Sequence, residues 1–115
     1  ARVALVRGLI NSPSVFFADE PTGNLDSEFS RVVLDLLQEV NATGQTIVMV
    51  THDLSSAGRG SRELYLRDGT IRGELDLGPA HLDATGHTHD APGRADAAAA
   101  ARHTQLVAFL ADMGW

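Results

Sequence analysis

Residues 15–20 (VFFADE) and 46–53 (TIVMVTHD) decide the fold, because each is a short apolar run that ends in polar residues. The first run has no interruption, which is typical of a strand buried on both faces of a parallel sheet. The second is rich in β-branched side chains, which favour strands. Between them, residues 27–42 carry apolar side chains at spacings of three and four, which predicts a helix. This order predicts two parallel neighbours joined by a right-handed crossover, and hence an α/β fold.

The connecting helix has a predicted start and a predicted packing face. Asp26 or Ser27 can cap its first turn, because a side-chain oxygen there accepts a free backbone N–H. The helix ends near residues 43–45, which include a glycine. The apolar stripe that should face the core consists of Phe29, Val33, Leu36, Leu37 and Val40.

The segments on either side also carry clear signals. Residues 2–10 are typical of the last turns of a helix, which Pro13 would stop. Residues 63–67 and 70–75 flank Asp68-Gly69, which predicts a terminal antiparallel hairpin. Residues 78–94 have the composition of a linker. Residues 95–113 predict a helix whose apolar end, residues 106–113, is a docking face on the preceding domain or, alternatively, a membrane anchor.

Composition limits the function classes. The 115 residues carry a net charge of −6, which disfavours attraction to nucleic acid, so no nucleic-acid partner is expected. There is no cysteine, which excludes a disulfide framework and a thiolate metal site. All nine basic residues are arginine, so these residues contain no Gly-rich loop ending in Gly-Lys-Ser/Thr for holding phosphates. The first residues lack an initiating methionine and a signal peptide, and we expect them to be a cut edge of a longer sequence.

An acid pair stands at the end of the first strand. The carboxyl edge of a parallel sheet is where ligands of open α/β sheets bind. There Asp19 can hold Mg²⁺ through its hydration shell, and Glu20 can orient an attacking water. The alternative for an isolated Asp-Glu pair is a solvated strand end.

The context of this pair favours the functional interpretation. Residues 19–27 (DEPTGNLDS) closely resemble the Walker B and D-loop stretch of ABC transporter ATPases. Residues 48–53 are similar to the switch-histidine segment of that family, and residues 59–71 to its closing hairpin. Residues 2–9 look like the helix after the signature motif, with Gly8 in place of a usual alanine at a cost of about 1 kcal/mol of helix stability. The resemblance covers residues 1–77 and is closest to the lipoprotein-release and macrolide-export type.

The resemblance implies roles for individual residues. Asp19 would belong to the Mg²⁺ site, Glu20 would be the catalytic carboxylate, and His52 would contact the γ-phosphate of ATP. An imidazole can donate a hydrogen bond to a phosphate oxygen. Asp26 matches the D-loop aspartate, which lies at the seam between two ATPase subunits, although its local role as a helix cap is an equally good interpretation.

The family also implies a fold and a function. The fold would be a partial P-loop sheet, with residues 1–77 as the C-terminal part of the ATPase domain and 78–115 as a linker and helix. The function would be ATP hydrolysis coupled to transmembrane transport, with membrane subunits and a second ATPase subunit as partners at the cytoplasmic face of the cell membrane. Without the Walker A and signature motifs, these residues alone should be inactive. The alternatives are a non-catalytic interaction fragment and, less favoured by Gly23-Asn24, a soluble ABC ATPase of translation or DNA maintenance.

Two further expectations follow. The strand at 46–51 should keep one unpaired edge, which invites association and poor solubility. His81, His87, His89 and Asp90 carry zinc-competent groups, but their spacing fits no compact finger, and a solvated linker is the favoured interpretation.

Overall fold

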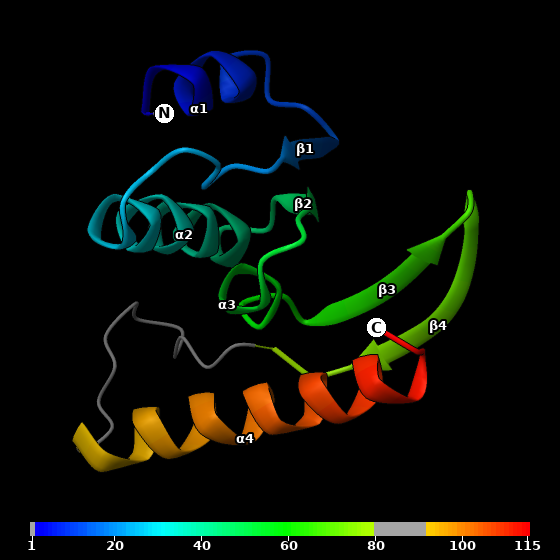
Figure 1. Ribbon diagram of the computed structural model, residues 1–115. Helices are drawn as coiled ribbons and strands as arrows, with labels where there is room; N and C mark the ends of the chain where they lie inside the picture. Colours follow the sequence, from blue (N-terminus) through cyan, green and yellow to red (C-terminus); the bar gives the residue numbers. More distant parts are fainter. Residues whose placement is uncertain (1, 80–91) are drawn as a thin grey trace. The chain divides into compact units, whose positions relative to one another are not determined.

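The computed structural model describes residues 2–79 and 92–115, which fall into two compact units, Ala1–Ser56 and Ala57–Trp115. The first unit contains the elements that carry the acid pair and the histidine, and the second contains the hairpin and the last helix (Figure 1). In chain order the elements are α1 (Arg2–Leu9), β1 (Val15–Asp19), α2 (Ser27–Ala42), β2 (Thr46–Val50), α3 (Leu54–Ala57), β3 (Arg62–Arg67), β4 (Thr70–Asp76) and α4 (Pro92–Asp112). The predicted domain boundary after residue 77 stays a prediction.

The sheet of the first unit confirms the predicted α/β arrangement. β1 pairs with β2 in parallel, in a register that runs from Val15 opposite Thr46 to Asp19 opposite Val50. The backbone N–H of Glu20 donates to the carbonyl oxygen of Val50 at 2.7 Å, which extends the pairing by one residue. The two strands therefore end side by side, and the residues that follow them emerge at one edge.

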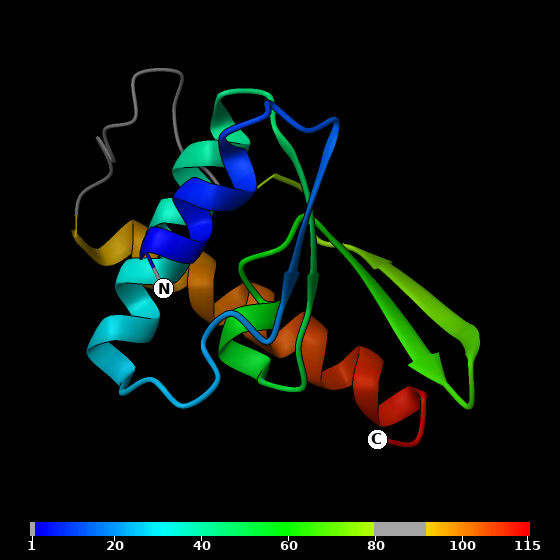
Figure 2. The same cartoon turned by 90° about the horizontal axis from the view of Figure 1, so that it is seen from above.

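One face of this sheet forms the core. Ala18, Val33 and Leu37 are buried, and five partly buried apolar side chains pack against them: Leu5, Phe16, Leu25, Ile47 and Met49. Both α1 and α2 lie on the same side of the strands (Figure 2). The predicted stripe on α2 is only partly correct, because Phe29 is 62% exposed whereas Leu34, outside the stripe, is buried. The helix turns Val33 and Leu37 toward the sheet, whereas Phe29 in its first turn stays exposed.

The other face of the sheet corrects the expectation of a strand buried on both sides. Alternate residues of a strand point to opposite faces. Val15, Phe17, Val48 and Val50 occupy the face away from α1 and α2, and they are between 41% and 71% exposed. Within the described residues, the helices of this unit cover the opposite face, so this apolar face is bare.

Two local features position the helices of the first unit: a cap at the start of α2 and a glycine in α1. The Asp26 carboxylate accepts a hydrogen bond from the backbone N–H of Phe29 at 2.9 Å, so the predicted helix cap is confirmed. Gly8 of α1 lies against Phe16, and a Cβ built at Gly8 would overlap the Phe16 ring. The glycine that weakens α1 therefore allows the helix to approach β1 closely.

The second unit contains the predicted hairpin. β3 and β4 pair antiparallel, with a register shift between Tyr65 and Leu66. Asp68 and Gly69 both have positive φ, 52° and 75°, as a two-residue type I′ turn requires. The turn prediction is confirmed.

Helix α4 packs on the hairpin within this unit. It begins at Pro92, three residues before the predicted start at 95, and proline is well suited to a first helical turn because its missing N–H needs no partner there. Leu106 is 2% exposed, and a Cβ built at Gly73 of β4 would come within 2.6 Å of the Met113 sulfur. Phe109 of α4 and Met113 just after it thus contact the hairpin, which confirms a docking face at this end of the helix, although Val107 is 41% exposed. Among the described helices, none is long and apolar enough to cross a membrane.

Candidate active site at the carboxyl edge of the parallel strands

The chain turns sharply after β1. Glu20 has φ of +44°, a left-handed conformation that costs a residue with a Cβ about 1–2 kcal/mol. The backbone N–H of Gly23 donates to the Glu20 carbonyl oxygen at 2.9 Å, which closes a tight turn. Unfavourable backbone of this kind persists only where the surroundings hold it in place, and it is common at functional sites.

Glu20 and His52 meet at this edge. The His52 Nδ1 atom lies 2.6 Å from Glu20 Oε1, and the His52 backbone N–H donates to the same oxygen at 2.9 Å. The Thr51 hydroxyl donates to Glu20 Oε2 at 3.2 Å. Both carboxylate oxygens are therefore held by the residues that follow β2, and the predicted juxtaposition of the two side chains is confirmed.

The electrostatics of this contact favour an ionised carboxylate. The hydrogen bond from the His52 side chain, assisted by those from the His52 backbone and Thr51, lowers the pKa of Glu20 below its ordinary value. The His52 side chain is 90% exposed, and its contact with Glu20 uses Nδ1. Nε2 is the ring nitrogen left for a ligand at this edge.

The structure places the other two predicted site residues apart from this contact. Asp19 is exposed at the end of β1, opposite Val50 in the register. Asp26 caps α2 with one carboxylate oxygen. In the described part of the chain there is no group of three or more potential metal ligands. A single exposed carboxylate nevertheless fits Mg²⁺, which commonly keeps several waters and uses one or two carboxylates together with substrate phosphates.

A set of hydrogen-bonded hydroxyls beside this edge, of which that of Ser56 is buried, was not predicted from the sequence. The Asp53 carboxylate oxygen Oδ2 accepts hydrogen bonds from the Ser55 hydroxyl at 2.7 Å, the Ser56 hydroxyl at 2.7 Å and the Ser56 backbone N–H at 3.0 Å. The Ser56 and Thr22 hydroxyl oxygens are 3.1 Å apart. The sequence signal was an aspartate with serines two and three residues later, a pattern typical of a helix N-terminus.

The alternative zinc site cannot be compared with the structure. Its candidate ligands, His81, His87, His89 and Asp90, all lie outside the described residues. The interpretation of residues 80–91 therefore stays a prediction.

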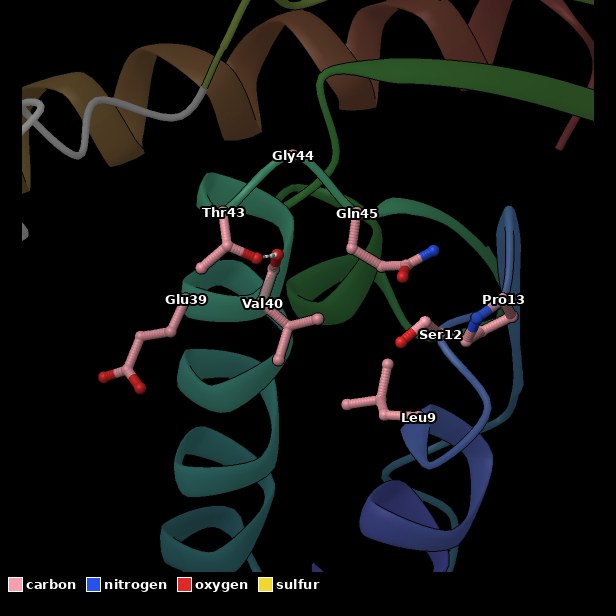
Figure 3. A pocket seen from close by; sticks show the side chains of 8 residues that line it. All are labelled: Leu9, Ser12, Pro13, Glu39, Val40, Thr43, Gly44 and Gln45. Carbon is pink, nitrogen blue, oxygen red and sulfur yellow. Dashed lines mark hydrogen bonds between the residues drawn. The ribbon is translucent and has the colours of Figure 1, made fainter.

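A shallow hollow of about 600 Å³ lies elsewhere on the first unit (Figure 3). Its lining residues are Leu9, Ser12, Pro13, Glu39, Val40, Thr43, Gly44 and Gln45. Five of these residues lie in the segments that lead into β1 or β2, so the hollow lies at the amino edge of the sheet. Glu20 and His52 follow the carboxyl ends of the strands, and the hollow is therefore separate from the candidate site.

Comparison with known proteins gives several extensive similarities, although no family model matches the chain. A macrolide export ATP-binding/permease protein MacB of Burkholderia pseudomallei is 41% identical over 117 residues, which cover 99% of this chain and 18% of that protein. The lipoprotein-releasing system ATP-binding protein LolD of Syntrophus aciditrophicus is 52% identical over 71 residues, which cover 61% of this chain and 32% of that protein.

Solved structures agree with these relatives. The dimeric structure of a post-hydrolysis state of the ATP-binding cassette MJ0796, bound to ADP and Pi, matches with a TM-score of 0.62 and 43% identity. The match covers 66% of this chain and 33% of that cassette. The chain therefore spans no more than about a third of the length of these relatives.

Proposed function

We propose, from the premise that this chain belongs to the ATP-binding cassette (ABC) family of ATPases, that it supplies two reacting side chains of a site that hydrolyses ATP to drive transport across a membrane. The observation that supports this proposal most is the contact between Glu20 and His52 at the carboxyl edge of β1 and β2. This edge is where α/β sheets bind their ligands.

Glu20 is assigned to the attacking water. Its lowered pKa keeps the side chain a carboxylate at neutral pH, which is the form that accepts a proton from water or orients it in line with the phosphoryl group. The left-handed backbone at Glu20 and the hydrogen bonds from Thr51 and His52 fix the direction of the carboxylate. A base held in this way needs little reorganisation during the reaction.

His52 is assigned to the terminal phosphate. With Nδ1 directed to Glu20, Nε2 is the nitrogen that faces the ligand, and an imidazole that carries a proton on both ring nitrogens donates from Nε2 to a phosphate oxygen, where charge develops as the bond to the leaving group breaks. The same imidazole then connects the carboxylate that handles the water to the phosphate that receives it. Such an arrangement positions both reactants on one rigid group.

Asp19 and Asp26 are assigned to the surroundings of the nucleotide. Asp19 would hold Mg²⁺ through water, and that ion would neutralise charge on the phosphates. Asp26, which caps α2, would also face a second ATPase subunit. MJ0796 was solved as a dimer, which supports a two-subunit assembly for this chain.

The remaining parts of the site must come from outside these 115 residues. No lysine is present, so the Gly-Lys-Ser/Thr loop that holds the phosphates is supplied elsewhere, and these residues alone should hydrolyse almost no ATP. Membrane subunits would anchor the assembly at the cytoplasmic face of the membrane and select the transported molecule. The similarity to MacB and LolD favours export from the membrane or across it.

The test is Glu20→Gln in the complete ATPase subunit that contains these residues, assembled with its membrane partners. Turnover should fall by about 10²-fold or more, because the amide cannot accept the proton, while ATP binding is kept. Glu39→Gln, on an exposed part of α2, is the matched control and should leave turnover unchanged. Full turnover in the Glu20 variant would reject the role assigned to Glu20.

A further inference from the structure

Ser56 is the most completely buried polar residue described in the chain, with 0% exposure. It lies in α3, four residues after His52. A buried hydroxyl is costly unless its hydrogen-bonding groups find partners. Ser56 has two such partners, Asp53 on its own segment and Thr22 in the turn that follows Glu20.

The direction of these hydrogen bonds follows from the number of protons. A serine hydroxyl has one proton to donate and two lone pairs that accept. An ionised carboxylate only accepts, so the Ser56 hydroxyl donates its proton to Asp53. The pKa of Asp53 is lowered, mainly by this bond, which is consistent with an ionised group. Ser56 must then accept from Thr22, whose hydroxyl is the donor across the 3.1 Å contact.

A second chain of hydrogen bonds joins the segment after β2 to the turn after β1, and it ends at the Glu20 carboxylate. The Asp53 backbone N–H donates to the Thr51 hydroxyl at 3.0 Å, and that hydroxyl donates to Glu20 Oε2. Asp53 therefore belongs to both chains of hydrogen bonds. The turn that begins at Glu20 is held at its carboxylate by Thr51 and His52, and two residues later by Ser56 through Thr22.

This double attachment has a physical reason. Glu20 has an unfavourable left-handed backbone, which persists only when the surrounding structure holds it. Thr22 is the second residue of the turn that a hydroxyl from another segment holds in place. That hydroxyl belongs to Ser56, which is buried and therefore has little freedom to move. Loss of this attachment would let the turn relax while the nearby strands stay paired.

We propose that Ser56 is a positioning residue, whose hydroxyl accepts the Thr22 proton and so keeps the Glu20 turn at a fixed distance from His52. This inference rests on the proposed function, because it concerns how the reacting carboxylate is held. It assigns no contact with ATP to Ser56. Small displacements of a reacting group can cost large factors in rate.

The experiment compares Ser56→Ala with Thr22→Val and with Ser55→Ala in the complete, assembled ATPase. Ser55 donates to the same Asp53 oxygen at the same 2.7 Å but makes no contact with Thr22, so it is a matched control. Ser56→Ala and Thr22→Val should each lower kcat about tenfold and leave the KM for ATP within about twofold. Ser55→Ala should stay close to the parent protein in both constants.

The double variant separates positioning from general destabilisation. If both residues act through their shared hydrogen bond, the double variant should be no slower than either single variant. Multiplying losses, or a Ser55→Ala loss as large as that of Ser56→Ala, would overturn the inference. Thermal unfolding of each variant identifies any loss that comes from unfolded protein, and Thr22→Val, at a half-buried position, gives an answer if Ser56→Ala does not fold.

Glu20→Gln measured in the same assembly distinguishes the two possible failures. An inactive Glu20→Gln beside a fully active Ser56→Ala would reject only the positioning role. A fully active Glu20→Gln would reject the proposed function itself, and the positioning role with it.

Discussion

At the Glu20–His52 edge the histidine ring faces solvent, whereas at the contact between α4 and the hairpin the Arg102 guanidinium donates to backbone carbonyl oxygens. Its Nε donates to Gly58 at 3.2 Å and its Nη1 to Leu77 and Gly78 at 3.0 Å each, while Nη2 donates to Gly60. Arg102 thus uses its N–H donors to hold main-chain segments of the second unit together. His52 leaves its ring 90% exposed and keeps a nitrogen for a ligand.

The comparison indicates that the Arg102 contacts stabilise the fold, whereas the Glu20–His52 contact leaves groups available to a ligand. A cation that makes four hydrogen bonds to main-chain carbonyls fixes the path of the chain and has little left for a substrate. A histidine and a glutamate paired at an exposed strand end contribute little to stability, since pairs in water are weak. Changes at Arg102 should therefore appear in stability, and changes at His52 or Glu20 in turnover.

The largest effect on stability expected from changing a polar side chain is that of Arg102→Ala. It removes four hydrogen bonds from a charged donor, and the free energy of unfolding of the 115-residue chain should fall by about 2–3 kcal/mol. Urea unfolding followed by circular dichroism measures this change. Arg72→Ala, at an exposed position of β4, is the control and should stay within about 0.5 kcal/mol of the parent. Equal midpoints for the two variants would contradict the structural role of Arg102.

A smaller, pH-dependent effect is expected at Glu63, next to the same contact. Burial raises the pKa of Glu63 to about 7, although Arg102 lowers it, and its Oε1 has no hydrogen-bond partner among the described residues. Between pH 4.5 and 7 the unfolded chain has lost this proton and the folded chain has kept it. Stability should therefore fall as pH rises through this window and stay level above it.

Glu63→Gln should remove this slope and, at neutral pH, stabilise the chain by about 1 kcal/mol after allowance for partial exposure. Unfolding midpoints measured at intervals from pH 4.5 to 8 test this prediction. Glu39→Gln, on α2, should keep the slope of the parent. A parent chain whose stability is constant over this range would show that Glu63 ionises normally.

Much of the first unit was predictable because its signals are local. Apolar runs that end in Asp-Glu and Thr-His, with a helix between them, indicate parallel strands and place Glu20 beside His52. The cap at Asp26 and the turn at Asp68-Gly69 follow from single-residue preferences. The roles of Glu20, His52, Asp19 and Asp26 in ATP hydrolysis stay predictions.

What could not be predicted depends on contacts between distant residues. The hydrogen bond between Thr22 and Ser56 joins positions 34 apart, and each is an ordinary polar residue in the sequence. Likewise Leu34 is buried while Phe29 is exposed, because the faces of α2 that are covered depend on what packs against the helix. Hydrophobic periodicity defines a face to within about one residue position and cannot fix that rotation.

The smallest expected effect on folding, and a test of the bare sheet face, is Phe17→Thr. Phe17 is 71% exposed between Val15 and Val48, and an apolar face of this kind, beside an unpaired strand edge, favours association of the 115-residue chain. The substitution should reduce association in sedimentation velocity runs while the free energy of unfolding changes by less than about 0.5 kcal/mol. Phe16→Thr, one residue away but on the core face against Gly8, should instead destabilise the chain by about 3 kcal/mol. A parent chain that stays monomeric at every concentration would contradict the prediction that this exposed apolar face drives association.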